Sequence, residues 1–207
     1  MCCDIAFLRS TRHSTLSCSS ASKAIELKFA PGGASGPQEY SPEDVFYYIY
    51  AVLHSPSYRT RYADFLRSDF PRIPLPDTAE RFRALAALGG KLTRQHLLKT
   101  AAKLGGFPKT GSNEVEKGYP KFTPPGTDET TGKVMINPEQ WFTGVSPEVW
   151  AFRVGGYQVA GKWLKDRRGR TLSLQEQGHY QKALGALSAT IGLMDEADEA
   201  MDGLIPV

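Results

Sequence analysis

The sequence has no cysteine after residue 18 and no long apolar run. Its three cysteines, Cys2, Cys3 and Cys18, all lie near the N-terminus of the 207-residue chain. A core without cysteine offers no disulfide framework and is typical of a protein from a reducing compartment. No apolar run approaches the roughly 20 residues needed to cross a bilayer, and the apolar patch near the N-terminus is too short for a secretory signal. We therefore expect a cytoplasmic protein with no membrane partner.

The sequence also lacks the common catalytic motifs. It contains no GxxxxGK[ST] phosphate-binding loop, no HExxH and no GxSxG. An Asn-Pro-Pro-Tyr-like tetrapeptide, which adenine methyltransferases use to hold the target amine, is missing as well. These absences predict that the chain alone is not an enzyme and needs no cofactor.

Histidine and cysteine give little support for a metal site. The four histidines occur singly and are predicted to be packed or surface residues: His13, His54, His96 and His179. Cys2, Cys3, His13 and Cys18 match no familiar zinc-finger spacing. We therefore interpret this part of the chain as an arm and expect no metal.

The first 40 residues differ from the rest in composition and hydrophobic pattern. They are rich in Ser, Gly and Ala and show no steady hydrophobic period, which is typical of a disordered segment. With 41% hydrophobic and 23% charged residues, the whole chain has an ordinary globular composition. We predict a loose or unrelated N-terminal arm over 1–40 and one folded domain over 41–207.

Helix-start signals recur after residue 40. In "SPEDVFYYIYAVL", Ser41 can cap a helix, Pro42 fits its first position and Asp44 closes a capping box. This helix is apolar on nearly every side, so we expect it to be buried as far as about His54. A second Ser–Pro start follows at 55–56, and Asp77 and Glu80 open a third helix in which the pair Gly89–Gly90 predicts a kink.

The second half of the chain mixes strands and helices. "EVEKGYPKF" and "GKVMIN" are predicted to be short strands, and "SPEVWAF" a short capped helix. A long final helix is predicted from Ser173, which forms a capping box with Glu176, to about Met201. The sequence therefore predicts an α+β fold: a helix-rich domain with a small β region and a long C-terminal helix.

The final helix carries an apolar stripe of five residues, Tyr180, Leu184, Leu187, Ile191 and Met194. The stripe continues past the point where a compact core should need it, and burying one Leu or Ile stabilises by about 1.5–3 kcal/mol. We therefore predict that part of it meets a second surface, either a partner protein or another copy of the chain. Self-association through the C-terminal helix is thus one expectation.

Charge is strongly segregated along the chain. The segment from Arg153 to Arg170, which we call the basic segment, holds six Lys or Arg residues and one acid, Asp166. The last 25 residues hold five acids and no Lys or Arg, whereas the whole chain has a net charge of +3. A helix dipole can explain one or two cations near a helix end, but not six. This segregation indicates an anionic partner.

The basic segment also has a helical pattern. Gln158, Lys162 and Lys165 are spaced i, i+4 and i+7 and so share one face. The opposite face has Ala160, Trp163 and Leu164, which are predicted to anchor the helix in a core. A cationic face with planar donors suits phosphate and base contacts. A plain solvated face and a surface for an acidic protein remain as alternatives.

We predict the nucleic-acid contacts as follows. The main candidates are Gln158, Lys162, Lys165, Arg167, Arg168 and Arg170, with Arg153 and Lys121 as weaker contacts to the DNA backbone.

Several long blocks resemble one known family. "SPEDVFYYIYAVLHSPSYRTRYADFLRSDFPRIPLP", "FRALAALGGKL", "VMINPEQWFTGVSPEVWAFRVGGYQVAGKWLKDRRGRTLS" and "HYQKAL" resemble the C-terminal specificity region of type ISP single-polypeptide restriction–modification enzymes. The resemblance runs from about Ser41 to Asp195 in the same order, and residues 1–40 match no part of that family. In that family, this region follows a nuclease, a helicase-like ATPase and an N6-adenine methyltransferase.

The resemblance implies a target-recognition domain that chooses a duplex-DNA sequence for other, catalytic modules. The implied partners are duplex DNA and an adenine methyltransferase domain, in cis or in trans. The alternative is a protein-interaction module that docks onto a methyltransferase without direct base readout, with the basic segment aiding solubility only.

Overall fold

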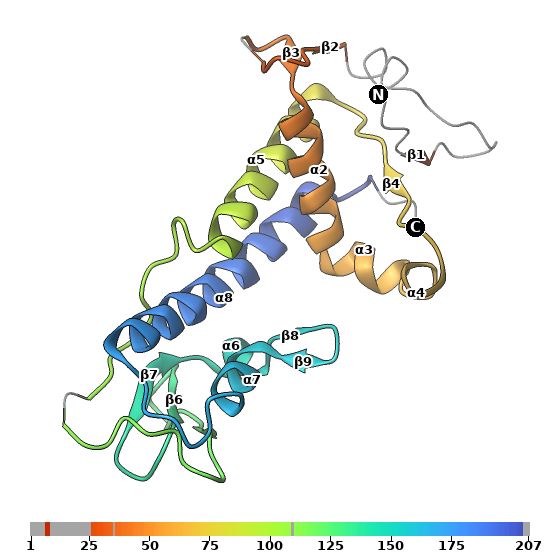
Figure 1. Cartoon of the computed structure of the whole chain (residues 1–207). Helices are drawn as coiled ribbons and strands as arrows, with labels where there is room; N and C mark the ends of the chain where they lie inside the picture. Colours follow the sequence, from red (N-terminus) through yellow and green to blue (C-terminus); the bar gives the residue numbers. More distant parts are fainter. Residues whose placement is uncertain (1–6, 9–25, 35, 109, 205–207) are drawn as a thin grey trace. The chain divides into compact units, whose positions relative to one another are not determined.

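The computed structural model describes residues 7–8, 26–34, 36–108 and 110–204 (Figure 1). These residues form helices and short strands, so the predicted α+β fold with a long C-terminal helix is confirmed. The chain divides into two compact units, residues 1–94 with 192–207, and residues 95–191. Helix α8 (Leu174–Ala200) contributes residues to both units. In the described part of the chain, no helix is both long and apolar enough to cross a membrane.

The first unit contains helices and two pairs of very short strands. The helices are α2 (Pro42–His54), α3 (Pro56–Arg61), α4 (Phe65–Ser68) and most of α5 (Ala79–His96). The parallel strand pairs are β1 (Phe7–Leu8) with β4 (Ile73–Pro74), and β2 (Lys28–Phe29) with β3 (Glu39–Tyr40).

The predicted helix starts of this unit are confirmed. The backbone N–H of Asp44 donates to Ser41 Oγ at 3.1 Å, and that of Ser41 donates to Asp44 Oδ2 at 2.8 Å, which completes the capping box. Ser55 likewise caps α3 by accepting from the N–H of Tyr58. The prediction that α2 is buried on every side is wrong for Phe46, which is 51% exposed.

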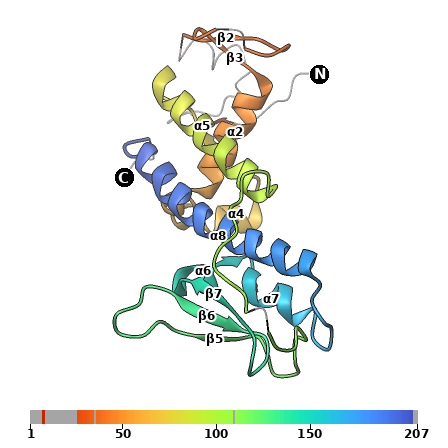
Figure 2. The ribbon, with the colours of Figure 1, turned by 90° about the vertical axis from the view of Figure 1, so that its left-hand side faces the viewer.

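The glycine pair in α5 serves packing, and the helix is continuous from Ala79 to His96. A Cβ atom added at Gly89 would lie 1.8 Å from the carbonyl oxygen of Tyr47 in α2. Only glycine therefore allows α2 and α5 to approach this closely, and the two helices lie side by side in Figures 1 and 2.

Part of the predicted N-terminal arm packs onto this unit. Leu27 and Tyr40 are almost fully buried in its core, and the Tyr40 ring contacts Phe82 at 5.5 Å. Residues 26–40 thus contribute packing that the Ser- and Gly-rich composition did not indicate. Residues 1–6 and 9–25, including Cys2, Cys3, His13 and Cys18, lie outside the described residues, and for them the arm stays a prediction.

The second unit is built around a three-stranded antiparallel sheet in the order β5 (Lys121–Thr123), β6 (Gly132–Met135) and β7 (Trp141–Val145). Strand β6 matches the prediction, whereas most of "EVEKGYPKF" is irregular and β7 was not predicted. Helix α6 (Pro147–Ala151), the hairpin β8 (Arg153–Val154) and β9 (Tyr157–Gln158), and helix α7 (Val159–Lys165) follow. Val134 and Phe142 from the sheet pack with Leu164 of α7 and Leu184 of α8 in one core.

Four of the five residues in the apolar stripe of α8 pack in the core of the second unit, and the fifth, Met194, is half-buried. Tyr180 and Leu184 are buried in the second unit, and Leu187 and Ile191 pack against the same core. Beyond residue 192, the helix buries Leu193 and Ala197 in the first unit, and Met201, directly after the helix, is buried there too. The helix thus supplies residues to two cores.

Candidate nucleic-acid interface

The basic segment folds as a hairpin, a short helix and a loop, all in the second unit. Ala160 and Leu164 are buried, and the Trp163 ring stacks on Tyr180 at 5.0 Å. The Tyr180 hydroxyl donates to the carbonyl oxygen of Ala160 at 3.2 Å. The three predicted anchors of α7 are therefore confirmed, and the opposite face with Lys162 and Lys165 is exposed.

Gln158 does not share that face. Helix α7 begins at Val159, and Gln158 is its N-cap residue with extended backbone angles. The Gln158 Nε2 group donates to the carbonyl oxygen of Trp150 in α6. Its amide thus ties the base of the hairpin to α6.

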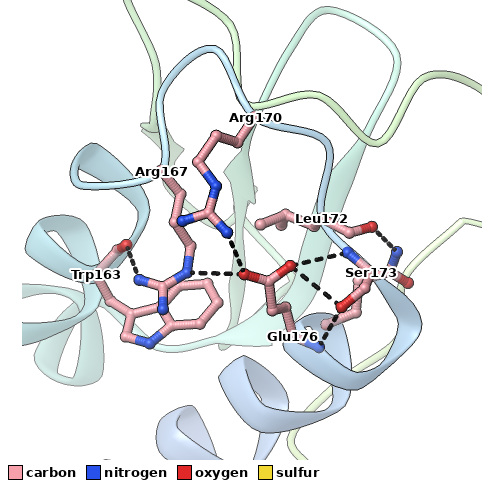
Figure 3. A network of polar contacts seen from close by, with 7 residues as sticks. Trp163, Arg167, Arg170, Leu172, Ser173 and Glu176 are labelled. Atoms are coloured by element: carbon pink, nitrogen blue, oxygen red, sulfur yellow. Dashed lines mark hydrogen bonds and ion pairs between the residues drawn. The ribbon is translucent and has the colours of Figure 1, made fainter.

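Arg167 is held by two neighbours, Trp163 and Glu176 (Figure 3). Its guanidinium lies over the Trp163 ring, 3.5 Å from the centroid, and its Nη1 donates to the Trp163 carbonyl oxygen at 3.0 Å. Its Nε forms an ion pair at 3.4 Å with Glu176 Oε1, without hydrogen-bond geometry. The side chain is only 24% exposed. Stacking and ion pairing together fix this arginine against the protein.

Glu176 connects the basic segment to the first turn of α8. Oε1 also accepts a hydrogen bond from Arg170 Nη2 at 3.0 Å, while Oε2 accepts from the N–H and the hydroxyl of Ser173 (Figure 3). The Ser173 backbone bond, then the Ser173 hydroxyl and the two arginines, lower the pKa of Glu176 below its usual 4.5 against an opposing effect of burial. The carboxylate therefore stays charged at neutral pH.

The other cations of the basic segment are more accessible. Lys162 pairs with Asp166, with both side chains about half exposed, and such a pair is weak. Lys165 is exposed and has no hydrogen bond or ion pair with any described residue. Arg170 keeps 60% of its side chain exposed despite its bond to Glu176. Arg153 donates to the Gly156 carbonyl oxygen at 3.1 Å within the hairpin.

A distant loop joins this surface through Arg168. The Arg168 Nε donates to the carbonyl oxygen of Tyr119, and Lys121 Nζ lies 4.9 Å from the centre of the Tyr119 ring. Exposed Lys117 lies two residues before Tyr119. The structure thus brings the predicted Lys121 to the basic segment and adds Lys117, which the sequence analysis missed. The only local signal was the pair of lysines that flank a Gly-Tyr-Pro turn.

Within the described part of the chain, no group of three or more His, Cys, Asp and Glu residues could hold a metal ion. The described histidines all have structural contacts. His54 Nδ1 donates to the carbonyl oxygen of Tyr50 in its own helix, His96 bonds Thr190, and His179 stacks on Trp163. Burial lowers the pKa of His54, although its bond to Tyr50 opposes this effect.

Comparison with known proteins gives one family. The model of the Type ISP C-terminal specificity domain matches residues 8–202, so the expectation that residues 1–40 match no part of the family is wrong from residue 8 onwards. No curated protein is detectably similar in sequence.

Three solved structures share the fold, each with a TM-score of 0.52. A nuclease-deletion mutant of the Type ISP restriction–modification enzyme LlaGI, in complex with a DNA substrate mimic, is 22% identical over 76% of this chain. The ATP-dependent Type ISP enzyme LlaBIII, bound to DNA, is 19% identical over 76%, and DrdV in a DNA complex is 24% identical over 81%. The chain covers 13%, 11% and 18% of these proteins, respectively.

Proposed function

Because the chain belongs to the family of Type ISP C-terminal specificity domains, we propose that it is a sequence-specific duplex-DNA recognition module of a restriction–modification system. The observation that carries this proposal is the exposed basic segment, which α7 anchors in the core of the second unit. The segment holds six cations and one acid, and ion pairs with Asp166 and Glu176 engage three of the cations, Lys162, Arg167 and Arg170. A rigid surface with this excess of positive charge suits a phosphate backbone.

The contacts divide the predicted residues into two roles. We propose that Lys162, Lys165, Arg168 and Arg170 contact DNA, with Arg153 and Lys121 as additional backbone contacts. Arg167 and Gln158 are mainly used inside the protein, so we propose that they position this surface. Arginine is suited to the DNA-contacting role because its planar donors can bind phosphates or guanine edges with two bonds.

The salt dependence of binding tests this proposal. If four to six cations contact phosphates, the slope of log affinity against log salt should be roughly −4 to −5. Fluorescence anisotropy of a labelled 30-base-pair duplex over a salt series measures it. Replacing Lys165, Arg168 and Arg170 by Ala should reduce the magnitude of the slope by up to about 3.

The matched control removes the same charge elsewhere. Arg59, Arg61 and Lys99 are exposed residues outside the basic segment, and their replacement by Ala should leave the slope unchanged. An equal loss in both triple variants would mean that net charge alone, with no defined DNA surface, drives the binding. An unchanged slope in the first variant would place the DNA surface elsewhere.

We further propose that the module directs an adenine methyltransferase, in cis or in trans, and has no catalysis of its own. The support is the family and the small share of the restriction–modification enzymes that the chain covers. The purified chain should transfer no methyl group to DNA and hydrolyse no ATP. Added to an adenine methyltransferase that lacks its specificity region, it should restore methylation at a defined sequence. Methyl transfer by the chain alone would overturn this proposal.

Self-association through the C-terminal helix has less support. The stripe from Tyr180 to Ile191 that suggested it packs inside the second unit. Light scattering of the chain at increasing concentration measures this directly, and a concentration-dependent mass would support self-association.

A further inference from the structure

The β8–β9 hairpin presents an apolar pair at its tip. Val154 pairs with Tyr157 across the two strands, and Gly155 and Gly156 form the turn between them. Val154 is 60% exposed and Tyr157 is 65% exposed. Gly155 has φ +57°, and a Cβ atom at either glycine would meet nothing within 4 Å. The turn of this hairpin (Figure 1) therefore has no side chain of its own, and the apolar side chains of Val154 and Tyr157 flank it.

The other cross-strand pair fixes the hairpin to the protein. Arg153 pairs with Gln158, Gln158 bonds Trp150 O and Arg153 bonds Gly156 O. Successive side chains of a strand point to opposite faces, so Val154 and Tyr157 lie on the face away from these two residues. Neither side chain has a ring contact or a hydrogen bond with any described residue. Packing within the protein therefore does not explain why this apolar pair is present and exposed.

The charge around the hairpin indicates what covers the pair. Arg153 lies in β8, and β9 leads directly into α7 with its exposed Lys162 and Lys165. DNA has negative phosphates outside and apolar base faces inside. An apolar tip next to a cationic surface is therefore complementary to DNA. Proteins that combine these features insert apolar side chains between base steps, and aromatic rings stack on bases.

We propose that the tip of this hairpin enters duplex DNA and packs the Tyr157 ring, with Val154 beside it, against base faces at an opened base step. This inference rests on the proposed DNA-recognition function and deepens it by assigning the residue that touches the bases. Phosphate contacts from the basic segment hold the module on the duplex. The affinity that the hairpin adds depends on how easily the base step opens.

The experiment compares an intact 30-base-pair duplex with the same duplex that carries one central mismatch. A mismatched base costs less to unstack, so a protein that inserts a side chain binds the mismatched duplex more tightly. Since base–aromatic stacking contributes about 1–3 kcal/mol per base, we expect the wild type to prefer the mismatched duplex roughly ten-fold. Tyr157→Ala should bring this ratio close to one, whereas Tyr157→Phe should keep it.

The control is Leu174→Ala, which removes an 84% exposed apolar side chain from the same unit and should keep the wild-type ratio. The melting temperature of Tyr157→Ala should equal that of the wild type. Three results would each overturn the inference. The wild type could bind both duplexes equally, or Tyr157→Ala could keep the preference for the mismatched duplex. Tyr157→Ala could also lose the preference while its melting temperature falls, which would indicate a general loss of structure. If the wild type binds no DNA at all, the proposed function itself fails.

Discussion

At the scale of single residues, Glu176 stabilises two structures at once. Its Oε2 completes the capping box of α8 with Ser173, and its Oε1 binds the guanidinium groups of Arg167 and Arg170. A carboxylate in the first turn of a helix also interacts favourably with the helix dipole. All of these interactions favour the charged form.

The variant Glu176→Gln should therefore make the protein less stable in a pH-dependent way. Glutamine can still complete the capping box, but it loses the charge, so we expect a melting temperature about 2 °C lower at pH 7. The folded state lowers the pKa of Glu176, so the carboxylate stabilises the fold above its usual pKa of 4.5 and less as pH falls through the lowered value. The difference between wild type and variant in thermal melts should thus vanish in acid.

Glu139→Gln is the matched control, because Glu139 is an exposed acid of the same unit and should show no such pH dependence. A difference for Glu176→Gln that grows on acidification would contradict the assigned role.

At the scale of elements, close approach of backbones decides where helices need glycine. Helix α8 contains Gly185, where an added Cβ would lie 2.0 Å from the carbonyl oxygen of Ala102, and Gly192, where it would meet nothing within 4 Å. Both are glycines in the middle of one helix, where alanine is intrinsically favoured by about 1 kcal/mol.

The substitutions Gly185→Ala and Gly192→Ala should consequently have opposite signs. Gly185→Ala must push the segment around Ala102 away from α8, so we expect destabilisation by about 1–3 kcal/mol. Gly192→Ala should stabilise by up to about 1 kcal/mol. Urea unfolding followed by circular dichroism measures both. Destabilisation by both variants would show that helix propensity and free space do not govern position 192.

At the scale of the whole molecule, α8 is the element that both units share. It buries Tyr180 and Leu184 in the second core and Leu193 and Ala197 in the first. Loss of either core therefore removes the packing of one half of the same helix. Since helices gain most of their stability from such packing, we expect the two units to unfold together.

The tryptophans allow this coupling to be tested. All three, Trp141, Trp150 and Trp163, lie in residues 95–191, so their fluorescence reports on the second unit. Leu85→Ala changes a fully buried residue of the first unit and should cost about 2–5 kcal/mol. We expect the tryptophan transition to shift to lower temperature together with far-UV circular dichroism. A tryptophan transition at the wild-type temperature would show that the units unfold independently.

The sequence by itself determined the features that depend on neighbours a few residues away. The capping boxes of Ser41 with Asp44 and of Ser173 with Glu176 join residues three apart, so the helix starts were predictable. The α+β class and the anchoring face of α7 followed from hydrophobic periodicity. The concentration of cations between Arg153 and Arg170 likewise needs no structure to be seen.

Only the tertiary structure decided the features that join distant parts of the chain. The bond of Arg168 to the Tyr119 carbonyl spans 49 residues, and the tight approach of Gly89 to Tyr47 joins two helices. Strand β7 was missed because a five-residue segment that contains Gly144 has a weak local signal, and pairing with β6 stabilises it. The positions of Glu176 and Trp163 in space decide which cations remain accessible. Local spacing determines only the neighbours within one helical turn, and tertiary packing determines the contacts between residues farther apart in the sequence.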